Sequence, residues 1–384
     1  MCDMACVYDP ACSLAEPIKG RLFTKLLLYC WQREYDKRPY VNFQFRRVDF
    51  EERLNRRYHC IRDFRIIVNF LLQCCQRSVS IWSVGLSNWD PRLLQDFVRS
   101  LQPVWQIELK LMRLPYEFFV MLRLKAQCMK VKELSLEGTP LTCDDVSMLR
   151  NFLLASKTLH TLNVCCCSLT QYNFAIVADG VYNSTSMRCF HVSRLLGAGL
   201  TLDTEKMISI VGSLLMQRKL TELTLELCEF TAQDMEIIAE YLQSPQCSLR
   251  KLHLANNLIA ADGALFLMRS AALGGTLKLL DISGNCIGSH GGEWVAKYFS
   301  SCYSLQHLYL NNNEIGAEAV SSILLSLKKP CRLKRLQLYG NKFNGRTAMI
   351  LHRLLDAKVL LHEEIDISYT YDEALQEYRV VPWR

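Results

Sequence analysis

The 384-residue sequence lacks any long apolar stretch, and none of its apolar runs reaches the roughly 18 residues that a membrane-spanning helix needs. Its first ten residues, Met1 to Pro10, contain acidic side chains and no apolar core, so we do not expect a secretion signal. Low-complexity tracts and long linkers rich in Pro, Gly and Ser are also missing. These absences predict a folded intracellular protein that does not bind a membrane. The cytoplasm is the expected compartment, and the nucleus and the cytoskeleton or cilium are the alternatives.

Catalytic signatures are missing as well. The chain has no Gly-x4-Gly-Lys-Ser/Thr phosphate loop, no His-Glu-x-x-His zinc helix and no Gly-x-Ser-x-Gly nucleophile elbow. Its 18 cysteines do not form matched Cys-x2-Cys pairs, and disulfides are rare in reducing compartments. We therefore predict no enzyme, no cofactor and no metal site, with cysteines that pack as small apolar side chains.

The formal charge of +7 is unevenly distributed. Residues 1–77 contain 14 Lys and Arg against 9 Asp and Glu, whereas residues 361–384 contain two Arg against six acidic side chains. A basic segment can attract an acidic partner. Acidic residues interrupt this one, however, and no nucleic-acid-binding module is recognisable, so nucleic acid is not among the expected partners.

What the chain does contain is a repeated pattern, Leu-x-x-Leu-x-Leu-x-x-Asn/Cys-x-Leu. Clean copies begin at Leu220, Leu249, Leu277, Leu305 and Leu333, at steps of 29, 28, 28 and 28 residues. A fixed period of this length predicts a leucine-rich repeat solenoid, because each unit supplies one strand that must stack on its neighbours. Weaker copies predict further strands at 81–86, 104–109, 131–136, 159–164 and 187–192, a decayed strand at 365–367 and an early one at 40–45.

The second half of each repeat has the period of an amphipathic helix. Met235, Ile238 and Leu242, for example, follow the spacing that places apolar side chains on one helix face. Thr142 and Thr231 each precede an Asp by three residues, a pattern typical of a helix start. The expected fold is an α/β horseshoe with a parallel concave sheet and outer helices.

Position nine of the repeat is predicted to be structural. An amide there turns into the interior and can bond backbone groups that the chain leaves unpaired as it exits the strand. Cysteine takes the same position in two repeats. The predicted ladder is Cys167, Cys228, Asn257, Asn285, Asn313 and Asn341.

The repeats at 249–257 and 305–313, read as Leu-Arg-Lys-Leu-His-Leu-Ala-Asn-Asn and Leu-Gln-His-Leu-Tyr-Leu-Asn-Asn-Asn, resemble the ribonuclease-inhibitor-like class of leucine-rich repeats. This class includes ribonuclease inhibitors, sensor domains of NOD-like receptors, RanGAP-type GTPase activators and axonemal or cytoskeletal adaptors. We expect a helical cap over residues 1–77 that could begin with a disordered stretch, a solenoid over 78–367, and a C-terminal cap or tail over 368–384, with a helix-like segment at 371–378.

One insertion interrupts the period. The step from Met187 to Leu220 is 33 residues, and the extra residues are predicted in the loop 193–201, where Gly197 and Gly199 supply flexibility. Loops inserted in solenoids emerge on one face, often the binding face.

The outward-facing strand positions predict the function. Tyr and Arg, which are enriched at binding hot spots, alternate there with His and charged residues. We expect a scaffold or adaptor that binds a protein partner through the concave face. The alternatives are a RanGAP-type GTPase activator, although its arginine loop is not recognisable, and an axonemal, cytoskeletal or ubiquitin-ligase adaptor. The predicted partner-binding residues are Lys251, His253, Asp281, His307, Tyr309, Arg335, Gln337 and Tyr339.

Overall fold

The computed structural model describes residues 43–46, 64–65, 67–69, 71–72, 77–82, 90–196, 202–327, 333–374 and 376–383. The chain forms two compact units. The first comprises residues 1–169 and 179–187, and the second comprises residues 170–178 and 188–384. Most of the predicted cap over 1–77 and the centre of the predicted loop, residues 197–201, lie outside the described part of the chain.

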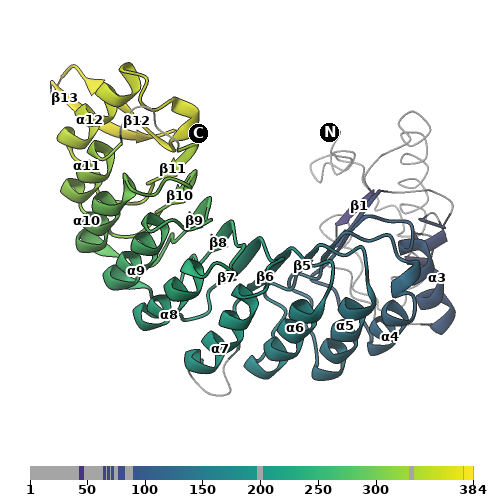
Figure 1. Cartoon of the computed structure of the whole chain (residues 1–384). Coiled ribbons are helices and arrows are strands. Elements are labelled where there is room, and N and C mark those ends of the chain that lie inside the picture. The colour runs from purple at the N-terminus through teal and green to yellow at the C-terminus, as the bar shows by residue number, and fades with distance from the viewer. Residues whose placement is uncertain are drawn as a thin grey trace, which may run out of the picture. The chain divides into compact units, whose positions relative to one another are not determined.

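The first unit has one parallel sheet covered by helices on one side (Figure 1). Its strands follow each other in chain order, as the repeat predicts. They are β1 (Phe43–Arg46), β2 (Ser78–Trp82), β3 (Gln106–Lys110), β4 (Glu133–Ser135) and β5 (Thr161–Asn163). The helical elements are α3 (Pro91–Leu101), α4 (Tyr116–Leu124), the 3-10 helix η4 (Ala126–Cys128) and α5 (Cys143–Ala155).

The strand predicted at 81–86 is displaced. In the structure, β2 begins at Ser78 and pairs Val79 with Ile107 and Ile81 with Leu109. Val79 and Ile81 are fully buried. They therefore occupy the two inward positions of the repeat, and the spacing of Ile81 with the next apolar residues is coincidental. The early strand expected within 40–45 exists as β1, which pairs with β2.

Helix α5 begins where the sequence pattern predicts. The backbone N–H of Asp145 donates to Oγ1 of Thr142 (3.3 Å), and the N–H of Thr142 donates to Oδ2 of Asp145 (2.9 Å). This reciprocal capping box satisfies two backbone donors that a helix start otherwise leaves without partners. The same pair of residue types begins α8 in the second unit.

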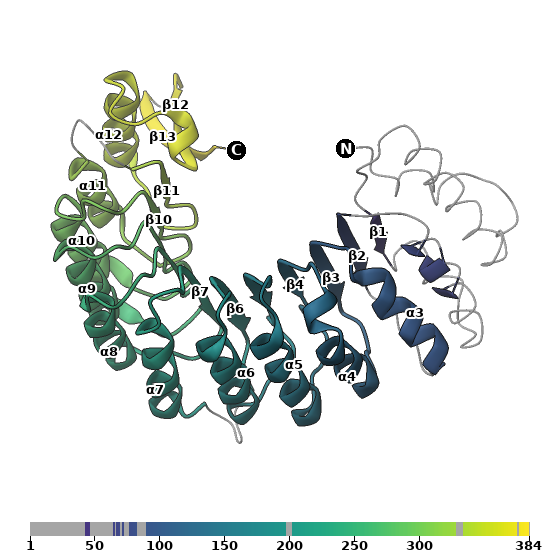
Figure 2. The same ribbon diagram turned by 45° about the vertical axis from the view of Figure 1, so that its right-hand side comes forward.

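The second unit repeats the arrangement, with strands along the inner side of a curved stack and helices along the outer side (Figure 2). Helix α6 (Gln171–Asn183) contains one of the points where the chain passes between the units, after residue 178. The strands are β6 (Cys189–Ser193), β7 (Glu222–Glu226), β8 (Lys251–His253), β9 (Leu279–Asp281), β10 (His307–Tyr309) and β11 (Arg335–Gln337). The helices are α7 (Thr204–Leu215), α8 (Ala232–Gln243), α9 (Ala260–Ala272), α10 (Gly288–Phe299), α11 (Ala317–Leu325) and α12 (Gly345–Asp356).

Each strand of the second unit leaves the sheet through the same turn. The residue at motif position eight has a left-handed backbone in all five clean repeats, with φ between 53° and 79°. This conformation favours Gly and Asn, which occupy four of the five positions. The turn directs the next side chain, the Asn or Cys of position nine, into the core. The position-eight residues are Leu227, Asn256, Gly284, Asn312 and Gly340.

The side chains at position nine connect successive repeats. Asn285 donates its N–H to Oδ1 of Asn313 (2.7 Å), and Asn313 donates its N–H to Oδ1 of Asn341 (3.1 Å). The Asn313 amide in turn donates to the carbonyl of Ile282 in the preceding repeat (2.9 Å). The Asn313 side chain therefore satisfies two backbone groups of the preceding coil, which accounts for the polar residue in a buried position.

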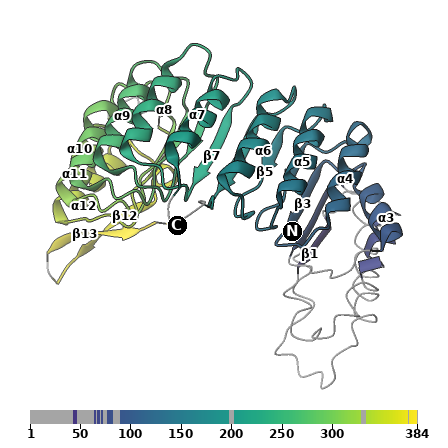
Figure 3. The same cartoon turned by 90° about the horizontal axis from the view of Figure 1, so that it is seen from below.

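The C-terminal end differs from expectation. The sequence predicts a helix-like segment over 371–378. The chain instead forms the antiparallel hairpin β12 (Ile367–Asp372) and β13 (Glu377–Pro382), which lies beside α12 (Figure 3). Tyr371 and Tyr378 are cross-strand partners with ring centroids 4.9 Å apart, and His352 of α12 packs on Tyr369 and Tyr378. Alternating aromatic residues favour a strand pair.

Candidate binding surface

The candidate surface is the side of strands β6 to β11 that faces away from the helices, which we call the strand face. Parallel pairing aligns the outward residues in rows across neighbouring strands. One row is Glu222, Lys251, Leu279, His307 and Arg335, and the next is Thr224, His253, Asp281, Tyr309 and Gln337.

All eight residues predicted to bind a partner lie on the strand face or at its edge. The register places His307 beside Arg335 and Tyr309 beside Gln337, as the repeat spacing predicts. Lys251 and Tyr339 are exposed, and the other six are half-buried because neighbouring side chains pack against one another. Their role in binding stays a prediction, since the geometry shows their position and not a partner.

Two acidic side chains, Glu222 and Asp281, lie near His253 on the strand face. Its Nε2 lies 3.7 Å from Oε1 of Glu222, and its Nδ1 lies 3.8 Å from Oδ2 of Asp281. Glu222 also receives Lys251 Nζ at 2.9 Å. Burial alone would lower the pKa of His253, but the two carboxylates outweigh burial and raise this pKa to about 9. His253 and then Lys251 lower the pKa of Glu222 to about 2, against the effect of burial.

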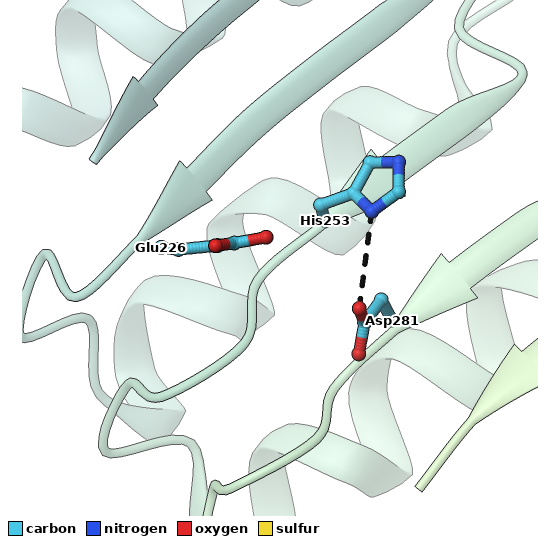
Figure 4. Close-up of side chains that lie close together, drawn as sticks. All are labelled: Glu226, His253 and Asp281. Atoms are coloured by element: carbon cyan, nitrogen blue, oxygen red, sulfur yellow. Dashed lines mark ion pairs between the residues drawn. The ribbon is translucent and has the colours of Figure 1, made fainter. Parts of the chain in front are cut away.

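Glu226, at the end of β7, stands apart from this ion-paired group. Burial, followed by the negative charge of Asp281, raises its pKa above the usual value. Figure 4 shows its carboxyl group directed towards the space beside His253 and Asp281. One possible ligand atom from each of the three residues lies within 4.8 Å of the others.

The neighbouring part of the strand face is basic and aromatic. Burial lowers the pKa of His307, and the positive charges of Lys334, Lys251 and Arg335 lower it further. The ring of His307 meets that of Tyr309 edge to face at 6.4 Å. His253 lies near the carboxylates of Glu222 and Asp281, whereas His307, two repeats further along, lies near the positive charges of Lys334, Lys251 and Arg335. The acidic outward side chains are therefore on β7 and β9, and the charged outward side chain of β11 is Arg335.

Glu222 and Glu226 are not among the residues that the sequence predicts to bind a partner. The alternation of inward and outward residues along a strand does not tell which acidic side chains lie close together. The distance between them depends on strand register and on side-chain rotamers. The signal that was present is their spacing of four residues on one strand, which places both on the same face.

Comparisons with known proteins agree with the repeat. A family model described as "Leucine Rich repeat" matches residues 276–295 and 301–324. Ribonuclease inhibitor of Sus scrofa is 28% identical over 240 residues, which cover 62% of this chain and 50% of that protein. The mouse "NACHT, LRR and PYD domains-containing protein 5" is 21% identical over 248 residues, which cover 58% of this chain and 21% of that protein. The chain thus matches half or less of the length of these relatives.

Among solved structures, an internalin of Listeria monocytogenes is 17% identical, with a TM-score of 0.41 over 73% of this chain and 72% of that one. The family match, the curated relatives and the strand–helix repeat together identify a leucine-rich repeat protein of the ribonuclease-inhibitor-like class. Among the helices that the structure describes, none combines the length and apolar character needed to cross a lipid bilayer.

Proposed function

We propose that the chain is a non-enzymatic scaffold that binds a protein partner through the strand face of the second unit. The observation that carries this proposal is the alignment of Tyr309, His307 and Arg335 side by side on an open sheet surface. Tyr and Arg contribute disproportionately to protein interfaces because they combine a large contact area with polar groups. Similarity to ribonuclease inhibitor, a protein named for binding another protein, supports the same class of function.

The rows on the strand face also favour a partner with complementary charge. The acidic side chains on β7 and β9 would contact a basic surface, and Lys334 and Arg335, at β11, would contact an acidic one. Such a division orients a partner, because reversing it would place like charges together. The GTPase-activator and adaptor alternatives depend on the shared fold alone.

The test compares two substitutions on the strand face with matched substitutions on outer helices. Tyr309→Ala and Arg335→Glu would be combined in one variant. The control variant would combine Tyr172→Ala on α6, whose side chain is 69% exposed, with Arg353→Glu on α12. Proteins retained by the full chain from cell extract would be quantified by mass spectrometry, after circular dichroism has shown that both variants fold.

We expect a small set of proteins to be lost from the strand-face variant and retained by the helix variant. If each of the two substituted residues contributes about 2 kcal/mol to the binding free energy, their combined loss decreases the affinity roughly 1,000-fold. The proposal fails if both variants retain the same proteins in the same amounts as the unaltered chain.

A further inference from the structure

The side chains around His253 have the composition and the placement of a metal site. Glu226, His253 and Asp281 are the last residues of three consecutive parallel strands, β7, β8 and β9. Neighbouring strands lie about 4.8 Å apart, so side chains at these positions can converge on one point. Figure 4 shows the carboxyl group of Glu226 to the left of the His253 ring and that of Asp281 below the ring.

We propose that Glu226, His253 and Asp281 bind a divalent first-row transition metal ion through two carboxylate oxygens and Nδ1 of the imidazole. Carboxylate and imidazole groups are common ligands for Mn²⁺, Co²⁺ and Zn²⁺. Three protein ligands leave at least one coordination position for water or for a group of a bound partner.

The distances between the ligand atoms are close to those that coordination requires. Metal–ligand bonds of about 2.1 Å place the ligands of a tetrahedral site roughly 3.4 Å apart. Nδ1 of His253 lies 3.8 Å from Oδ2 of Asp281, and one ligand atom from each residue lies within 4.8 Å of the others. Movements of about 1 Å, within reach of small side-chain rotations, would complete the site.

Glu222 supplies the orienting group that metal-bound histidines usually have. It faces Nε2 of His253 at 3.7 Å, and Lys251 in turn holds its other oxygen at 2.9 Å. A carboxylate beside Nε2 favours the proton on that nitrogen when Nδ1 binds a metal. The Glu222 side chain therefore acts as a positioning group and not as a ligand.

The charges at this place suit a dication. Lys251 is paired to Glu222 at 2.9 Å, so its ammonium group does not neutralise Glu226 or Asp281. A divalent ion bound between Glu226 and Asp281 would balance the charges of these two carboxylates.

The test uses Mn²⁺ as the probe, because this hard ion prefers carboxylate and imidazole ligands over the many thiols of the chain. The reduced full chain, freed of metal with a chelator, would be titrated with MnCl2, and free Mn²⁺ would be measured by electron paramagnetic resonance. We expect one saturable site per chain. Spin-echo spectra should show coupling to an imidazole nitrogen, and His253→Gln should remove this coupling.

Three variants separate a metal site from a structural ion pair. Glu226→Gln should abolish the saturable site yet leave the fold intact or slightly more stable, since it removes the repulsion with Asp281. Glu222→Gln should weaken binding by about 10- to 100-fold, as expected for a group that orients a ligand. The control His290→Gln alters an exposed histidine 3.6 Å from Glu293 on α10 and should leave binding unchanged.

The inference is overturned if Glu226→Gln binds Mn²⁺ as tightly as the unaltered chain, or if no site saturates in the unaltered chain. Binding that persists in every variant would point to adventitious sites elsewhere and would overturn it equally. These readouts do not depend on a protein partner, so they are independent of the proposed scaffold function.

Discussion

Replacement of Asn313 by Ala tests the role of position nine in holding the repeats together. This side chain is fully buried. Its Oδ1 accepts the backbone N–H of Asn285 at 2.7 Å, and its Nδ2 donates to the carbonyl of Ile282 at 2.9 Å. Alanine removes both partners and cannot admit solvent in compensation, so two backbone groups of the preceding repeat lose the amide that satisfies them.

The cost follows from those two groups. A buried donor or acceptor that loses its partner costs about 1–3 kcal/mol, so the pair predicts a loss of about 2–6 kcal/mol in the free energy of unfolding. The effect should be centred on the two coils that Asn313 connects, because neighbouring repeats of a solenoid stabilise each other across their shared interface.

Urea unfolding followed by far-ultraviolet circular dichroism would measure the loss, and amide hydrogen exchange would locate it. Asn312→Gly is the matched control. Asn312 is the exposed residue before Asn313 with a left-handed backbone (φ 53°), and Gly occupies the same position in two other repeats at Gly284 and Gly340. We expect the control to change stability by less than about 0.5 kcal/mol. A loss below about 1 kcal/mol for Asn313→Ala would refute the bridging role.

Three further predictions concern the packing and chemistry of single residues. Gly263→Ala in α9 should destabilise the fold by about 1–3 kcal/mol despite the better helix propensity of Ala, because a Cβ there would lie 2.4 Å from Ile259. The control Gly275→Ala should not destabilise the fold, because a Cβ there would have no atom nearer than 3.5 Å. Thermal unfolding of the two variants would measure the difference. Thr142→Ala should cost about 1 kcal/mol by removing the cap of α5, as chemical unfolding would show. Cys302 is buried, and burial raises its pKa to about 12, so it should react with iodoacetamide at pH 8 only after unfolding. The exposed Cys286 should react in the native state. Peptide mapping would distinguish the two cysteines.

The repeat period and the alternation within each strand were sufficient to predict the fold. Because both are local properties, a single coil at 305–313 already shows which side chains face the core and which face outward. The parallel order of the strands, the helix starts and the alignment of His307 with Arg335 follow from repeating that coil. The pattern misled where it was short and unsupported, at the strand predicted at 81–86 and at the C-terminal hairpin.

The sequence by itself therefore determined the architecture, the buried amides and the composition of the strand face. Only the tertiary structure decided how that face is divided. His253 and His307 occupy equivalent strand positions in the sequence pattern, yet one lies between two carboxylates and the other beside three basic groups. The physical reason is that the charge and burial around each histidine depend on side chains about 28 residues away in the chain. The distances between those side chains and the histidine are set by strand register and rotamers, which no local sequence pattern specifies.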